Sequence, residues 1–134
     1  DLLCSLPLVT AAKGIVYIDQ ALYYYRQRPG SAVHSYNIQR KESVKVVHME
    51  LAKNIDIWGM PELKPLHNAR KVRGWMDNLK LLLKNRYTLS PKDLREQLNS
   101  MAEDRYFRSA YRNMDKAVLS LKDRIIAFWL YYLK

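Results

Sequence analysis

The residues best suited to chemistry lie in one short stretch, between positions 15 and 34. Its sequence, IVYIDQALYYYRQRPGSAVH, combines a run of tyrosines, two arginines and a Pro-Gly turn that ends in Ser31. The guanidiniums of Arg26 and Arg28 offer planar sets of donors that suit carboxylates and phosphates. A Gly-Ser turn can direct backbone N–H groups and a hydroxyl at the same anion. The stretch therefore indicates an anion-binding turn, although an ordinary solvated turn after an edge strand has the same composition.

The first quarter of the chain resembles the C-terminal end of the catalytic domain of bacterial family 2 glycosyltransferases, which have the GT-A fold. The residues that carry the resemblance are Asp1-Leu2-Leu3 and the run IVYIDQALYYYRQRPGS. In that family a Glu-Asp pair opens a helix, and two strands of the form vyid-x-x-L-Y-x-Y-R precede an R-x-G-S turn. The rest of the chain is similar, only loosely, to the variable helical tails of such enzymes.

The resemblance implies a hexosyltransferase that moves a sugar from a nucleotide-sugar donor to a glycan or lipid-linked acceptor in surface polysaccharide synthesis. It implies that Asp1 is the general base, because sugar transfer needs a carboxylate beside the attacking hydroxyl. It places four further residues near the donor diphosphate: Arg26, Arg28, Ser31 and His34.

The resemblance also implies a divalent metal, Mg²⁺ or Mn²⁺, in the complete enzyme. The sequence contains neither the nucleotide-binding βαβ half of the family's fold nor the Asp-x-Asp motif that holds the metal. We therefore expect the chain to be a fragment that binds no metal and has no transferase activity alone. We also expect a cytoplasmic location, peripheral on the inner face of the plasma membrane, where family enzymes often meet lipid-linked acceptors.

A second informative stretch lies at residues 125–133, where IIAFWLYYL is apolar throughout and is flanked by Lys122, Arg124 and Lys134. It is too short to span a bilayer. Two interpretations stay open: a helix lying in the interface of an anionic membrane, or a helix buried at the centre of the domain. The residues expected at headgroup level in the first case are Trp129, Tyr131, Tyr132 and Lys134.

Hydrophobic periodicity predicts a mainly α-helical fold with one small β element. The first dozen residues form a short buried helix in this interpretation, and the β-prone runs at 15–18 and 21–26 form two strands. Four helices follow, expected at about 38–58, 66–86, 90–98 and 114–132. The segment 106–111 is predicted to be looser, and the four helices to pack as an irregular bundle.

These elements suggest two regions joined in one compact unit. Residues 1–36 would be the remnant of the catalytic domain, and residues 37–134 a helical C-terminal region. The single cysteine, Cys4, lies among leucines and is expected to be buried. His48 and His67 fall within helices, and their spacing does not suggest a metal site.

The charge of the chain suggests an alternative function. Lys and Arg total 23 against 13 Asp and Glu, giving a net charge of +10 that favours phosphates, nucleic acid or anionic lipid. The alternative is therefore a basic helical module for binding nucleic acid or another protein, with clusters such as Arg70-Lys71-Val72-Arg73. No helix-turn-helix, RRM or zinc signature accompanies them, which disfavours nucleic acid. An exposed apolar face would also favour self-association.

Overall fold

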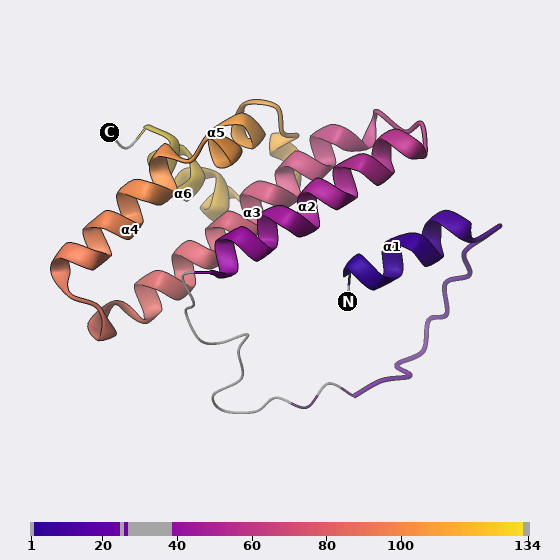
Figure 1. Ribbon diagram of the computed structural model, residues 1–134, viewed down its shortest axis with the longest axis horizontal. Helices are drawn as coiled ribbons and strands as arrows, with labels where there is room; N and C mark the ends of the chain where they lie inside the picture. Colours follow the sequence, from indigo (N-terminus) through magenta and orange to yellow (C-terminus); the bar gives the residue numbers. More distant parts are fainter. Residues whose placement is uncertain (1, 25, 27–38, 133–134) are drawn as a thin grey trace.

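The computed structural model describes residues 2–24, 26 and 39–132. These ranges contain six α-helices: α1 (Leu2–Ala11), α2 (Arg40–Ile57), α3 (Leu63–Lys84), α4 (Pro91–Glu103), α5 (Arg105–Arg112) and α6 (Leu121–Tyr132). Two short 3-10 helices separate some of them, η1 (Arg86–Thr88) and η2 (Lys116–Val118). In Figure 1, α2 and α3 run side by side along most of their length. The helical part of the predicted fold class is therefore confirmed.

Helix α3 lies at the centre of the domain because it contacts every other long helix of the bundle: α2, α4, α5 and α6. Its buried apolar residues recur every three or four positions, so they form one continuous face. They are Ala69, Val72, Trp75, Met76, Leu79 and Leu82. The core continues into the neighbouring helices through Met101, Ala102, Phe107, Ala110, Ala127 and Leu130.

The largest buried side chain of this core is Trp75, which has no exposed surface. Its indole N–H donates a hydrogen bond of 3.1 Å to the backbone carbonyl of Met101, at the end of α4. The ring of Phe107 stacks on the indole at 6.4 Å, and the ring of Tyr106 packs at 5.9 Å. One side chain of α3 thereby contacts both α4 and α5.

Helix α5 corrects the prediction of a looser segment at 106–111. Asp104 ends α4 and caps α5, since its Oδ1 accepts the backbone N–H groups of Tyr106 at 2.8 Å and Phe107 at 3.3 Å. Its Oδ2 accepts from the Lys45 ammonium on α2 at 2.7 Å. This cap, together with burial of Phe107 and Ala110, makes an eight-residue helix stable in a charged sequence.

The last helix begins later than the predicted position 114. Ser120 and Asp123 form reciprocal bonds at its start: the Ser120 Oγ accepts from the Asp123 N–H at 3.2 Å and donates to its carboxylate at 2.9 Å. Before it, the Asp115 side chain caps η2 by accepting from the Ala117 N–H at 2.9 Å. The apolar pattern is continuous across this junction, and only the capping bonds mark the boundary.

Other predicted boundaries are confirmed. The Ser90 Oγ accepts from the Asp93 N–H at 3.1 Å and Pro91 opens α4, as the capping pattern indicated. Helix α2 ends in a left-handed Gly59, with φ of 64°. The N–H of Met60 then donates a hydrogen bond of 3.2 Å to the carbonyl of Ile55. The N–H of Gly59 donates one of 3.1 Å to the carbonyl of Asp56.

The predicted two-stranded element is not found, because residues 14–24 and 26 have no strand in the structure. An isolated hairpin is marginal unless a sheet or helix covers one face, and nothing in the described part of the chain covers this one. Tyr23 and Tyr24 are 80% and 91% exposed rather than packed in an aromatic layer. Cys4, expected to be buried, is also exposed.

Truncating Phe107 tests the packing of α5 against α3. We expect Phe107→Ala to lower the free energy of unfolding by about 3–5 kcal/mol, because the ring is fully buried and stacks on Trp75. Urea denaturation followed by circular dichroism measures this change. Tyr87→Ala is the control, since that ring is 83% exposed and its loss should change stability by less than about 1 kcal/mol. Equal effects of the two substitutions would contradict the packing described.

Candidate functional site

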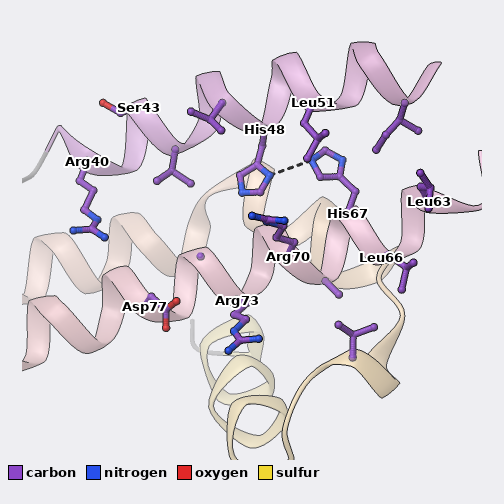
Figure 2. Close-up of a pocket in the computed structure, with 16 residues that line it drawn as sticks. Arg40, Ser43, His48, Leu51, Leu63, Leu66, His67, Arg70, Arg73 and Asp77 are labelled. Atoms are coloured by element: carbon purple, nitrogen blue, oxygen red, sulfur yellow. Dashed lines mark hydrogen bonds between the residues drawn. The ribbon is translucent and has the colours of Figure 1, made fainter. Parts of the chain in front are cut away.

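A groove of about 840 Å³ lies between α2 and α3 (Figure 2). Its walls come from both helices, with Val118 of η2 at one edge. The apolar lining residues are Val44, Val47, Leu51, Ile55, Leu63, Leu66, Ala69 and Gly74. The polar ones are Arg40, Ser43, His48, His67, Arg70, Arg73 and Asp77. We call this cavity the α2–α3 groove.

Two histidines face each other across the groove, as Figure 2 shows. The Nδ1 of His48 lies 3.0 Å from the Nε2 of His67, so one ring donates a hydrogen bond to the other. Each side chain is on a different helix and only 6% exposed. The pair is therefore a buried polar link between α2 and α3.

Both imidazoles are neutral near pH 7. Burial lowers the pKa of His48 to about 4, and the positive charges of Lys71 and Arg70 add to this effect. Burial also lowers the pKa of His67 to about 4. The charge of Lys71, the His48 ring and the charge of Arg70 lower it further, in that order. The ring that accepts the bond between them must be neutral, because a protonated imidazole donates from both nitrogens.

The basic cluster at positions 70–73 is divided between two sides of α3. Arg70 and Arg73 are exposed at the edge of the groove. Lys71 instead turns toward α5, where its ammonium lies 5.4 Å from the centre of the Tyr106 ring and donates to Asn68 at 3.3 Å. Burial lowers the pKa of Lys71. The cluster therefore does not present one continuous row of cations, as a nucleic-acid backbone would need.

The polar groups of the groove are suited to binding a ligand. It combines guanidinium donors, one hydroxyl from Ser43 and two neutral imidazoles with an apolar floor. Its carboxylate, Asp77, already forms an ion pair of 3.4 Å with Lys80. Within residues 2–24, 26 and 39–132 there is no group of three His, Cys, Asp or Glu placed to hold a metal.

Most residues of the site predicted from the sequence are outside the part of the chain that the structure describes. Asp1, Arg28, Ser31, His34 and Lys134 fall outside the described residues. Arg26 is described and exposed, and it does not line the groove. The convergence of these residues on a donor diphosphate therefore stays a prediction.

Helix α6 combines features of both interpretations of its apolar sequence. Ala127 and Leu130 are buried in the core. The opposite side carries an exposed stripe at helical spacing, made of Leu121, Ile125, Phe128, Trp129 and Tyr132. Trp129 is 67% exposed. In the described part of the chain no helix has both the length and the apolar character to cross a membrane.

Tyr131 does not belong to this stripe. Its ring stacks on that of Tyr111 at 4.5 Å, and its hydroxyl accepts a 2.7 Å hydrogen bond from the Arg112 guanidinium. The guanidinium of Arg108 lies 4.5 Å from the same ring. Tyr131 therefore packs α6 against α5. Of the three predicted interface residues that the structure describes, Trp129 and Tyr132 lie on the exposed side.

The sequence did not reveal the histidine pair, because its members are 19 positions apart and on different helices. The pair could have been predicted by aligning α2 and α3 as two antiparallel helices joined by the short turn at Gly59. With that register, position 48 of α2 lies opposite position 67 of α3.

Comparisons with known protein families, with characterised proteins and with solved structures found no match to this chain. The resemblance of residues 1–34 to glycosyltransferases therefore depends on its own motif. The α2–α3 groove must likewise be interpreted from its geometry and charges.

The neutral histidine pair predicts loss of stability in mild acid. Between pH 6.5 and about 4 the unfolded chain binds protons at His48 and His67, whereas the folded protein does not. The free energy of unfolding should therefore fall as the pH is lowered through this window, by on the order of 3 kcal/mol for each histidine. Urea denaturation at a series of pH values measures the slope.

The double substitution His48→Gln and His67→Gln removes both titrating groups and should flatten this slope. Carboxylates that titrate in the same range are unchanged in the double variant, so the difference between the two curves isolates the pair. An unchanged slope would show that the histidines do not govern the acid sensitivity.

Proposed function

We propose that the chain is the C-terminal part of a bacterial family 2 glycosyltransferase, which transfers a sugar from a nucleotide-sugar donor to a glycan or lipid-linked acceptor. The observation that carries the proposal is the continuous run IVYIDQALYYYRQRPGS after Asp1-Leu2-Leu3. No single tripeptide in this run is specific for the family. The order of its parts is specific: a β-prone segment, tyrosines, arginines and a Gly-Ser turn. The structure contributes two supporting features.

The first supporting feature is the exposure of residues 15–24. Apolar side chains are concentrated here, yet Ile15, Val16 and Tyr17 are each more than three-quarters exposed. A contiguous apolar surface of this kind is usually covered by another protein surface. A β-prone segment that lacks partner strands can obtain them by joining an existing sheet. The exposure therefore supports the view that this segment completes a catalytic domain.

The second supporting feature is the attachment of α1 to the helical region. Leu6 is buried, and the Thr10 hydroxyl donates to the Asn54 side chain at 2.9 Å and accepts from the Trp58 indole at 3.0 Å. Leu3 and Leu8 are exposed on the same short helix. Helix α1 thus offers one side to α2 and leaves further apolar surface for a second partner.

In this proposal each residue near the turn has a chemical role. Asp1 would take the proton of the acceptor hydroxyl, and Arg26 and Arg28 would neutralise the diphosphate of the leaving nucleotide. Ser31 and His34 would add donors to the same phosphates. The sequence has no Asp-x-Asp motif and the described residues have no metal-holding group. The residues present therefore do not fit the family's metal, and we derive no step through it.

The exposed stripe of α6 supports a peripheral position on an anionic membrane. Trp129, Tyr132 and Phe128 present aromatic surface on one side of the helix. Lys122 and Arg124, in the first turn of the same helix, are exposed and positively charged. An amphipathic helix with aromatic residues and flanking cations suits the headgroup region of such a membrane. This arrangement would hold the enzyme near a lipid-linked acceptor.

The catalytic proposal is tested with the polypeptide encoded by the complete reading frame. That polypeptide should transfer sugar from a nucleotide donor, and the 134-residue chain alone should not. Arg26→Gln should lower kcat/KM for the donor by about 10- to 100-fold, because a charge-assisted bond to phosphate contributes roughly 1.5–3 kcal/mol. Arg95→Gln, an exposed arginine on α4, is the control. Transfer by the chain alone, or upstream sequence without Glu-Asp and Asp-x-Asp motifs, would refute the proposal.

The membrane role is tested by flotation with anionic liposomes at low salt. The chain should float with the liposomes, and the double substitution Phe128→Gln and Trp129→Gln should weaken binding by at least about tenfold, since each buried aromatic ring contributes roughly 1.5–3 kcal/mol. Tyr87→Gln removes an exposed aromatic ring distant from the stripe and should have no effect. Failure of the unaltered chain to float would eliminate this role.

A further inference from the structure

The two ends of the α2–α3 groove differ in chemistry. Because α2 and α3 are antiparallel, the start of α2 lies beside the later part of α3. Figure 2 shows Arg40, Ser43 and Asp77 at one end, with Leu63 and Leu66 at the other. The groove is therefore polar and basic at one end and apolar at the other. This polarity along its length is what an amphiphilic ligand requires.

The dimensions of the groove restrict the kind of ligand. Arg40 and Ile55 line it at its two ends, and a rise of 1.5 Å per residue separates them by about 22 Å along α2. A volume of about 840 Å³ over that length gives a mean width of only about 7 Å. An α-helix with side chains is about 10–12 Å across. The groove thus suits one extended hydrocarbon chain better than a docked helix, and its volume is typical of a small-molecule site.

The charges at the groove favour an anionic head. Arg70 and Arg73 are three residues apart on α3 and both line the groove; in Figure 2 the Arg70 guanidinium lies between the two helices, whereas that of Arg73 points away from α2. Within the described residues Arg70 forms no hydrogen bond or ion pair, and its charge is close enough to lower the pKa of both groove histidines. Arg40 adds a third positive charge at the polar end. Three arginines against the single carboxylate Asp77 give the lining a net positive charge, which favours an anionic head such as a phosphate.

Gly74 lines the groove at a place where side chains of α2 approach α3 closely. A Cβ atom at this position would lie 3.8 Å from the Val44 side chain and 3.9 Å from the Nε2 of His48, in ordinary contact with both. A longer side chain at position 74 would therefore extend into the groove between the two helices. The neutral histidine pair contributes polar surface here without adding a charge.

We propose that the α2–α3 groove binds a single-chain amphiphile with a phosphate monoester head. Its hydrocarbon chain lies along Val47, Leu51 and Leu66, and its phosphate meets Arg70, with Arg73 adding positive charge at the edge. The proposal depends on the geometry of the groove alone, so it holds whether or not the chain belongs to a glycosyltransferase.

Calorimetric titration of the full chain with dodecyl phosphate, below the concentration at which micelles form, tests the proposal. We expect saturable binding of one molecule per chain. Dodecyl maltoside has the same tail with a neutral head, and inorganic phosphate has the head without a tail. Each should bind at least tenfold more weakly, because each engages only one end of the groove.

Two groups of variants locate the binding. The double substitution Arg70→Gln and Arg73→Gln should weaken dodecyl phosphate binding at least tenfold, and Gly74→Leu should block it. Leu66→Gln, at the exposed edge of the groove, gives a milder test if Gly74→Leu does not fold by circular dichroism. Arg95→Gln controls for loss of charge, and Trp129→Gln controls for binding on the α6 stripe; neither should change the affinity.

Three results would overturn the proposal. The first is no saturable binding, and the second is equal affinity for the neutral and the phosphate amphiphile. The third is full binding by the Arg70→Gln and Arg73→Gln double variant. Binding of an acidic amphipathic peptide in place of dodecyl phosphate would also overturn it and would identify a protein partner instead.

Discussion

The fold depends on burying the Trp75 indole with its one polar group satisfied. An indole N–H without a partner in the core would cost roughly 1–3 kcal/mol, and here it reaches the Met101 carbonyl at 3.1 Å. That bond fixes the end of α4 against the middle of α3. The chain must then turn within one residue, Asp104, to bring Phe107 onto the other side of the indole. The positions of α4 and α5 follow from this one side chain.

Asp104 extends the same constraint to the groove. Its carboxylate caps α5 and also accepts from Lys45, whose ammonium lies 5.5 Å from the centre of the Trp75 ring system. Lys45 is on α2, the helix that forms one wall of the groove. The carboxylate of Asp104, the ammonium of Lys45 and the indole of Trp75 therefore connect the core with the groove. The spacing of α2 from α3 thus depends on how the core packs.

Local signals in the sequence predicted the elements whose boundaries are set locally. Ser90 and Pro91 begin α4, and Gly59 ends α2, because a cap or a left-handed glycine acts on its immediate neighbours. Helix α5 was missed, since its stability comes from one cap and from burial of Phe107 by a helix distant in sequence. The strands were predicted from the β propensity of 15–26, and propensity does not supply a partner strand. The histidine pair depends on the register between two helices, which no spacing within either helix encodes.

Gly74 is at odds with the helix that contains it. A glycine in a helix interior is less stable than alanine by roughly 1 kcal/mol, and an alanine methyl would fit here at ordinary contact distances. Selection for thermal stability alone would therefore favour Gly74→Ala early, and the added methyl group would narrow the space between α2 and α3. Stability and the capacity of the groove thus compete at a single position. A thermostable descendant of this chain would be expected to have a smaller groove.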